Sequence, residues 1–331
     1  MKPLVLSRAL IFCAALVPAH TAPSDEYRLA LPDHQGLLSW SVSGFKIIQS
    51  SAKPDGREIG LRGRDALGRL TFLGFLFRAP ENAPVTSEAC RDAVLAQEKK
   101  TNATLKILKT SDIPQSAGLS VTLVTYTAAN QDGSTGYRVR GFVASGDICG
   151  DLEFYSHDRI TGDDADLKNS FRSLQLDPAY APRFADLALY AQILLQQQEY
   201  RAAAPIFERA LAAVPSDGAP FPSATLARRV MRDQTGMSYG IAGDLPKARR
   251  IFEEGVAADP DYPMNYYNLA CADAGENKLP EARIHLRQAF DRKANMNPGE
   301  TLPVPTEDDS FAPYKDNQEF WAFLERLQAG Q

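Results

Sequence analysis

The chain has 331 residues, of which 44% are hydrophobic and 23% charged, with a net charge of −5. This composition is ordinary for a globular protein, and the length predicts two domains. The arginines and lysines are scattered and form no long basic block. We therefore expect no nucleic-acid partner and no strong attraction to anionic membranes.

The first residues have the pattern of a secretory signal peptide. Lys2 and Arg8 make a basic start, and an apolar run, ALIFCAALV, covers residues 9–17. This run is too short to span a bilayer. We predict a signal peptide over residues 1–22 and an exported protein, periplasmic or extracellular, with no membrane span. A buried first helix is the alternative interpretation of this segment.

Residues 23–177 are predicted to form a front domain of strands and helices. From Ser39 to about Leu176, apolar and polar residues alternate as they do in strands. The expected strands are GFKIIQSSA, REIGLRGRD, RLTFLGFLFRA, TLKILKT, LSVTLVTYTA, TGYRVRGFVAS and DICGDLEFYS, with helices over residues 87–100 and 163–176. Turns such as KPDG and NQDGS connect neighbouring strands as hairpins, so we predict an α+β domain with an antiparallel sheet and two helices.

The order of these elements resembles that of the PsbP-like fold. In both, three strands and a helix are followed by further strands and a final helix, and the ending LKNSFRSLQL, residues 167–176, is similar to the last helix of that group. The resemblance implies an exported domain that binds or assists other proteins.

Near Pro178 the hydrophobic pattern changes from the two-residue period of strands to the period of a helix. We expect the two domains to separate there. In residues 178–295, Ala248 and Ala282 are 34 residues apart, and a related segment begins at Ala203. A loop-like insertion, SDGAPFPSATL, lengthens the first interval. Small residues at this spacing, each followed by a large apolar one, resemble tetratricopeptide repeats. The resemblance implies an all-α solenoid of about three repeats that binds a protein or peptide in a groove.

Tetratricopeptide repeats bind partners through set positions on the first helix of each repeat. The matching residues here are Ala188 and Gln192, Asp233 and Met237, and Tyr267 and Cys271. We predict a partner groove that includes Gln192, Asp233, Met237 and Tyr267. No Lys, Arg or Asn stands at these positions, so we expect an apolar or aromatic peptide rather than a carboxylate-ended tail. Asp273, where the repeats usually have Tyr, predicts altered helix contacts nearby.

Residues 296–331 are predicted to form an acidic linker and a capping helix. Phe320, Phe323, Leu324 and Leu327 share one helical face. A stack of repeats exposes an apolar face at its end, which such a helix can cover. The carboxylates at 307–309 have no supporting histidine, so we expect a solvated acidic loop rather than a metal site.

Motifs for catalysis, metal binding and phosphate binding are absent from the sequence. His285 is expected on the surface. His157 is expected to be a loop histidine, with a general base as the alternative. We predict no catalytic residues, metal or cofactor, and hence a non-enzymatic protein-binding scaffold. An enzyme or a small-ligand-binding envelope protein, with an unrecognised site in the front domain, is the alternative.

Three cysteines follow the predicted signal peptide. Cys271 lies in an apolar stretch of a repeat helix and is expected to be a buried thiol. An oxidising compartment would permit a disulfide between the other two, Cys90 at the start of a helix and Cys149 in the last hairpin. Two unrelated buried thiols remain the alternative, because the sequence does not show how far apart they lie.

Overall fold

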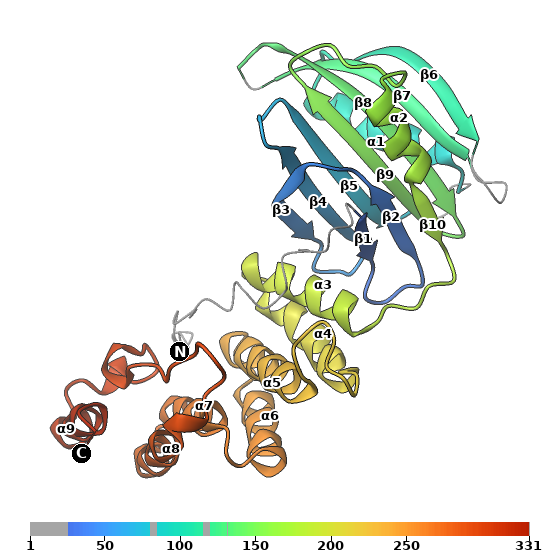
Figure 1. Ribbon diagram of the computed structural model, residues 1–331. Coiled ribbons are helices and arrows are strands. Elements are labelled where there is room, and N and C mark those ends of the chain that lie inside the picture. The colour runs from blue at the N-terminus through green and yellow to red at the C-terminus, as the bar shows by residue number, and fades with distance from the viewer. Residues whose placement is uncertain (1–25, 80–84, 115–119, 131, 331) are drawn as a thin grey trace. The chain divides into compact units, whose positions relative to one another are not determined.

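The computed structural model describes residues 26–79, 85–114, 120–130 and 132–330 (Figure 1). The predicted signal peptide lies outside the described residues. The chain forms two compact units, one β-rich and ending at Asp186, the other helical and starting at Leu187. Helix α3 (Phe184–Gln196) contains this junction. None of the described helices combines the length and apolarity needed to cross a bilayer.

All seven strands expected from the sequence occur in one antiparallel sheet of the β-rich unit. Its order is β3-β4-β5-β9-β8-β7-β6, and the central pairing of β5 with β9 joins two groups of hairpins. The strands are β3 (Phe45–Ala52), β4 (Glu58–Asp65), β5 (Leu70–Arg78), β6 (Lys106–Pro114), β7 (Ser120–Ala129), β8 (Thr135–Ser145) and β9 (Ile148–Ser156).

A second, three-stranded sheet was not expected. It consists of β1 (Glu26–Ala30), β2 (Leu37–Ser41) and β10 (Gln175–Asp177), in the order β1-β2-β10. The predicted helix over 163–176 is therefore too long: α2 covers Ala165–Ser173, and the next residues pair with β2. A three-residue strand is too short for periodicity to reveal, and its partner strand is remote in sequence.

The two helices of this unit lie on opposite faces of the large sheet. Side chains alternate along β9, so Cys149 and Asp151 point to one face and Phe154 to the other. Helix α1 (Ser87–Thr101) is bonded to Cys149 and covers the first face. Phe171 of α2 packs edge-on against Phe154 on the second face, with ring centroids 5.5 Å apart.

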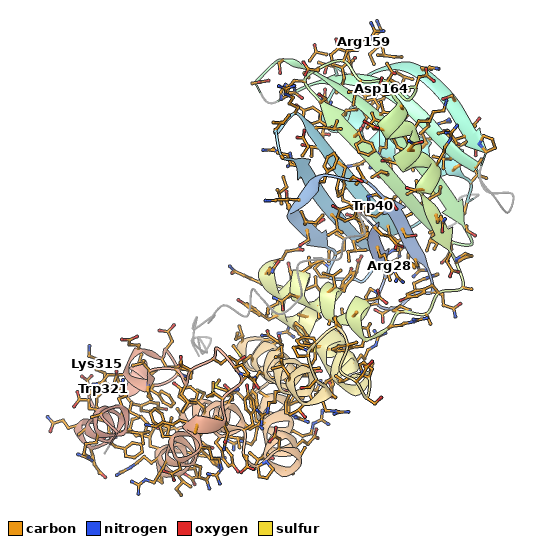
Figure 2. The ribbon with its side chains drawn as sticks, in the orientation of Figure 1. Arg28, Trp40, Arg159, Asp164, Lys315 and Trp321 are labelled. Atoms are coloured by element: carbon orange, nitrogen blue, oxygen red, sulfur yellow. A yellow bond between two sulfur atoms is a disulfide. The ribbon has the colours of Figure 1, made fainter. Side chains whose placement is uncertain are left out.

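The small sheet packs on the same face as α2 through an aromatic cluster. Trp40 of β2, labelled in Figure 2, is fully buried and contacts the rings of Tyr27 and Phe72. It lies directly over Gly74 of β5, where an added Cβ atom would stand 2.4 Å from the indole ring. Glycine at this position is therefore what lets Trp40 approach the sheet.

The predicted disulfide between Cys90 and Cys149 is present. The two Cα atoms are 6.0 Å apart, and both residues are buried. Cys271 is a free, buried cysteine, also as expected. The bond links the first turn of α1 to the strand beneath it.

The helical unit continues after α3 with helices that pack in succession. They are α4 (Tyr200–Ala212), α5 (Ala224–Ile241), α6 (Leu245–Ala258), α7 (Pro263–Gly275) and α8 (Leu279–Asp291). The alanines that mark the repeat, Ala203, Ala248 and Ala282, are all buried. At Gly236 of α5 an added Cβ atom would stand 2.3 Å from the ring of Phe252 in α6. Small residues thus allow the close helix crossings, in agreement with a tetratricopeptide-like arrangement.

The end of the chain is folded against these helices. Short 3-10 turns, η2 (Lys293–Asn295), η3 (Pro305–Glu307) and η4 (Ala312–Tyr314), lead to α9 (Gln318–Gln328). The four apolar residues expected on one face of α9 are buried, so the capping role is supported. The expectation of a solvated acidic loop at 307–309 is wrong for Asp308, which is buried together with Phe311.

We expect the disulfide to contribute about 4 kcal/mol to stability, because it closes a long loop in the unfolded chain. Reducing agent should lower the unfolding free energy of the β-rich unit by that order, as measured by urea titration. The unreduced, denatured protein from residue 23 onward should contain one titratable thiol, Cys271. Cys271→Ala is the control: it should remove that thiol and leave the effect of reduction intact. Three thiols in the unreduced protein would contradict the bond.

Candidate functional site

The predicted groove positions lie on α3, α5 and α7, but they differ in accessibility. Gln192, Asp233 and Met237 are half-buried, whereas Ala188 is buried. Tyr267 is only 1% exposed, and its neighbour on the helix face, Cys271, is 3% exposed. The accessible part of the predicted set is therefore limited to α3 and α5.

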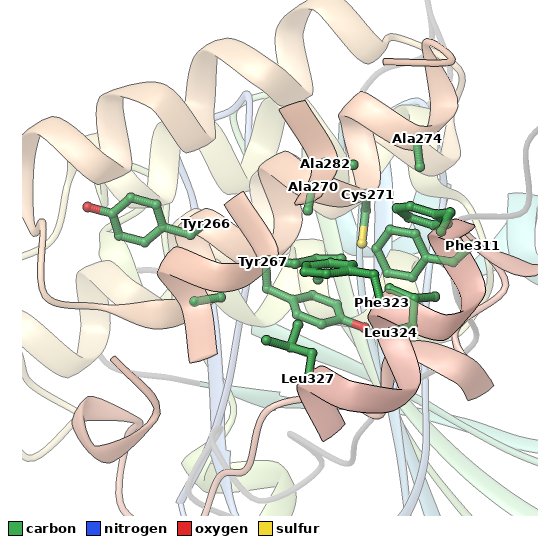
Figure 3. Packing of buried hydrophobic residues seen from close by; sticks show 13 residues of the cluster. Tyr266, Tyr267, Ala270, Cys271, Ala274, Ala282, Phe311, Phe323, Leu324 and Leu327 are labelled. Atoms are coloured by element: carbon green, nitrogen blue, oxygen red, sulfur yellow. The ribbon is translucent and has the colours of Figure 1, made fainter. Parts of the chain in front are cut away.

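Tyr267 is covered by the C-terminal segment of the same chain. Its hydroxyl donates a hydrogen bond of 3.0 Å to Asp308 Oδ2, and its ring meets Phe311 edge-on with centroids 6.1 Å apart. Figure 3 shows Tyr267 and Cys271 within the cluster that includes Phe311, Phe323 and Leu324. The expectation that Tyr267 lines an open groove is corrected, because a partner would first have to displace residues 308–327.

Burial also determines the protonation of this cluster. Desolvation raises the pKa of Asp308, although the Ser310 backbone N–H and the Tyr267 hydroxyl both donate to the carboxylate and oppose the shift. Desolvation likewise raises the pKa of Cys271 well above its ordinary value, and the nearby Asp308 adds to this rise. Cys271 is therefore a protonated, inaccessible thiol rather than a nucleophile.

Asp233 belongs to a polar network that connects α5 with the start of α7. It accepts hydrogen bonds from Tyr262 Oη at 2.8 Å and from Asn268 Nδ2 at 3.2 Å. Burial raises the pKa of Asp233 to about 7; the bond from Tyr262 opposes this rise and the nearby Glu300 carboxylate increases it. Asp233 thus serves mainly to join helices, and it is not an exposed charge for a partner.

Residues that follow α8 complete this network. Asn297 Nδ2 donates to Tyr262 Oη at 3.1 Å and to Glu300 Oε2 at 2.9 Å. Arg229 of α5 donates to Asn297 and forms an ion pair of 2.7 Å with Asp259. The segment after α8 is therefore tied to α5. Sequence analysis missed it because Asn297 and Glu300 lie in an irregular stretch without periodicity.

Asp273, which replaces the tyrosine usual in the repeats, joins α6, α7 and α8. Its carboxylate lies 2.7 Å from Arg249 Nη2 and 2.6 Å from His285 Nδ1. Burial alone would raise the pKa of Asp273, but the bonds from His285 and Arg249 hold it below its ordinary range. The expectation of a surface role for His285 is corrected, since it is half-buried and paired with Asp273.

Of the uncharged residues predicted to line the groove, two remain partly accessible. Gln192 of α3 and Met237 of α5 offer an amide and a flexible thioether. A separate cleft of about 540 Å³ lies between α8 and α9 and is lined by Ile284, Arg283 and Phe320, among others. Within the described ranges, no group of three or more His, Cys, Asp and Glu side chains is arranged to hold a metal ion.

Part of the chain is similar to several solved structures. PcrH from Pseudomonas aeruginosa shares 15% identity over 44% of this chain and 90% of its own, with a TM-score of 0.30. SycD from Yersinia enterocolitica is a type III secretion chaperone solved with a peptide of the translocator YopD. It shares 17% sequence identity over 44% of this chain and 91% of its own, with a TM-score of 0.29. The tetratricopeptide domain of Sgt2 from Aspergillus fumigatus shares 15% sequence identity over 45% of this chain and 84% of its own, with a TM-score of 0.30.

No protein-family model matches the sequence. No curated protein matches it either.

The raised pKa of Asp233 predicts a pH dependence of stability. Between about pH 4 and pH 7 the folded state holds a proton that the unfolded state has lost, so the unfolding free energy should fall as pH rises. The slope is at most about 1.4 kcal/mol per pH unit for one proton. Asp233→Asn should flatten it in urea titrations followed by helical circular dichroism, whereas the exposed control Asp316→Asn should not. An unchanged slope in Asp233→Asn would contradict this assignment.

Tyr267→Phe should destabilise the helical unit by about 1–3 kcal/mol, because it leaves the buried Asp308 carboxyl without one of its donors. The measurement is urea unfolding, with limited proteolysis of residues 296–330 as a second readout. Tyr200→Phe is the control, since its hydroxyl has no hydrogen bond within the described part of the chain. Equal stability of the two variants would show that the hydroxyl does not hold the C-terminal segment in place.

Proposed function

We propose that the chain is an exported, non-enzymatic scaffold that binds a protein or peptide through about three tetratricopeptide-like repeats. The repeats are the helix pairs α3–α4, α5–α6 and α7–α8. The observation that carries this proposal is the burial of Ala203, Ala248 and Ala282 in helices of a series that pack in succession. Stacked helix pairs present their first helices on one concave face, and that face is the usual binding surface of such proteins.

The binding site proposed is the face of α3 and α5 that includes Gln192 and Met237. Gln192 and Met237 are both uncharged and half-buried, and Met237 packs partly against the cluster that includes Tyr239 and Phe252. A methionine side chain adapts to apolar side chains of different shape. We infer an apolar or aromatic peptide segment as the partner. Tyr267 joins the site only in a state in which Phe311 and α9 have moved away.

Export is proposed on two observations. The sequence begins with a signal-peptide pattern, and Cys90 and Cys149 form a disulfide, a bond typical of oxidising compartments. The β-rich unit is proposed to be related to the PsbP-like fold, because its strand and helix order resembles that group. A boundary between domains near Asp177–Pro178 is likewise a proposal, and limited proteolysis can test it.

Met237→Glu should weaken peptide binding at least about tenfold, because it places a charge where apolar contact is expected. Peptides are selected from a random display library on the intact protein, and their affinities for the two forms are then compared by fluorescence anisotropy.

The matched control is Ile284→Glu, which puts the same charge on an exposed apolar residue of α8. It should bind like the unmodified chain. Loss of binding only in Ile284→Glu would move the site to the α8–α9 cleft. Unchanged binding in both variants would reject the proposed face.

A further inference from the structure

The face of the large sheet that carries α1 contains a cleft. Its volume is about 870 Å³, within the range of sites for small organic ligands. Its walls come from β4, β5, β8 and β9 and from the second half of α1. This cleft lies wholly within the β-rich unit and is independent of the helical repeats.

A buried charge cluster forms one wall of the cleft. Arg140 of β8 lies at its centre, 2.7 Å from Glu98 of α1, 2.9 Å from Asp151 and 3.1 Å from Glu153. Arg140, Asp151 and Glu153 are each less than 7% exposed. Placing charges in a protein interior is costly, and a buried charge cluster that lines a cleft is therefore a candidate functional site.

The cluster is short of positive charge. Two arginines, Arg138 and Arg140, pair with three carboxylates, Glu98, Asp151 and Glu153, so the cluster has one negative charge in excess when all three are ionised. Burial raises the pKa of both Asp151 and Glu153, even though Arg140 opposes each shift. An additional cation in the cleft would relieve this imbalance.

Polar atoms of the cluster also lack partners. Asp151 is fully buried, and among the residues that the structure describes no donor reaches its Oδ1 atom. Its other oxygen accepts from Arg140 Nη2. A buried carboxylate oxygen without a donor costs free energy, so the charge of Asp151 is only partly compensated by Arg140.

The adjacent strip of the same sheet face, on β5, is apolar and aromatic. Leu73, Phe75 and Phe77 project from alternate positions of β5 into the cleft and are half-buried. Tyr155 lies beyond them on β9, with the Arg138 guanidinium 5.0 Å from its ring centroid. A ligand in the cleft would therefore meet carboxylates on one side and apolar surface on the other.

We propose that this cleft binds a small organic cation, a protonated amine on an apolar or aromatic body, with the amine beside Asp151, Glu153 and Glu98. The body packs on Leu73, Phe75 and Phe77. We propose an organic cation rather than a metal ion, because within the described ranges no group of three or more His, Cys, Asp or Glu side chains is arranged to hold a metal. A carboxylate ligand would face the excess negative charge.

The proposal is tested by titrating the intact protein with phenethylamine, ethylamine and hydrocinnamate, followed by ligand-observed NMR. Phenethylamine carries both the cation and the aromatic body, ethylamine has the cation without the ring, and hydrocinnamate has the ring with a negative charge. Phenethylamine should bind most tightly, ethylamine more weakly, and hydrocinnamate should not bind at about 10 mM. Binding of hydrocinnamate at least as tight as that of phenethylamine would overturn the proposal, as would no binding by phenethylamine.

Variants locate the binding within the cleft. Asp151→Asn and Glu98→Gln should each weaken phenethylamine binding about tenfold, since each removes one charge from the cluster. Glu98 is only partly buried and its amide replacement still accepts from Arg140, so this variant keeps the test valid if Asp151→Asn misfolds. Asp112→Asn, which removes an exposed carboxylate from β6, is the control and should bind unchanged. Equal affinity in Glu98→Gln and in the control would place the amine elsewhere and reject the site.

Discussion

The Cys90–Cys149 bond holds α1 against one face of the large sheet, and the organisation of the β-rich unit depends on that contact. The helix covers β7, β8 and β9 on this face, with Leu95, Val124 and Phe142 buried beneath it. The neighbouring surface over β4 and β5 stays uncovered and forms the wall of the cleft. Because Glu98 lies two turns beyond Cys90 on the same helix, fixing the helix also places Glu98 against Arg140.

Arg140 places a buried charge on the face of the large sheet that carries α1. Its guanidinium is buried, and although burial alone would lower the pKa of Arg140, the carboxylates of Asp151 and Glu153 raise it well above its ordinary value. On the opposite face the core is aromatic, with Trp40 packed on Phe72 and Phe154 packed on Phe171. The two faces therefore have different roles, one for stability and one for a proposed ligand.

In the helical unit, the apolar face at the end of the repeats must be covered. This requirement determines which side chains a partner can reach. Tyr267 and Phe311 are buried by one another and by α9, so the last repeat is closed by the chain itself. The network of Asp233, Tyr262, Asn297 and Glu300 fastens the segment that makes this closure. Gln192 and Met237 remain the accessible positions of the predicted groove, and the proposed partner site is smaller than the repeat pattern alone would imply.

The sequence by itself determined the features that depend on local pattern. Alternation located all seven strands of the large sheet, and the spacing of Ala203, Ala248 and Ala282 located the paired helices. Elimination among three cysteines left Cys90 and Cys149 as the candidate pair, and the structure shows that they are bonded. The strand and helix predictions succeeded because hydrophobic period and small residues at helix crossings are properties of short segments. Only the tertiary structure decided the pairing of β10 with β2, the burial of Tyr267 under Asp308, and the meeting of Arg140, Asp151 and Glu98 in one cleft. Each of these joins residues that are far apart along the chain, and which distant segments meet is settled by packing of the whole core rather than by any local preference.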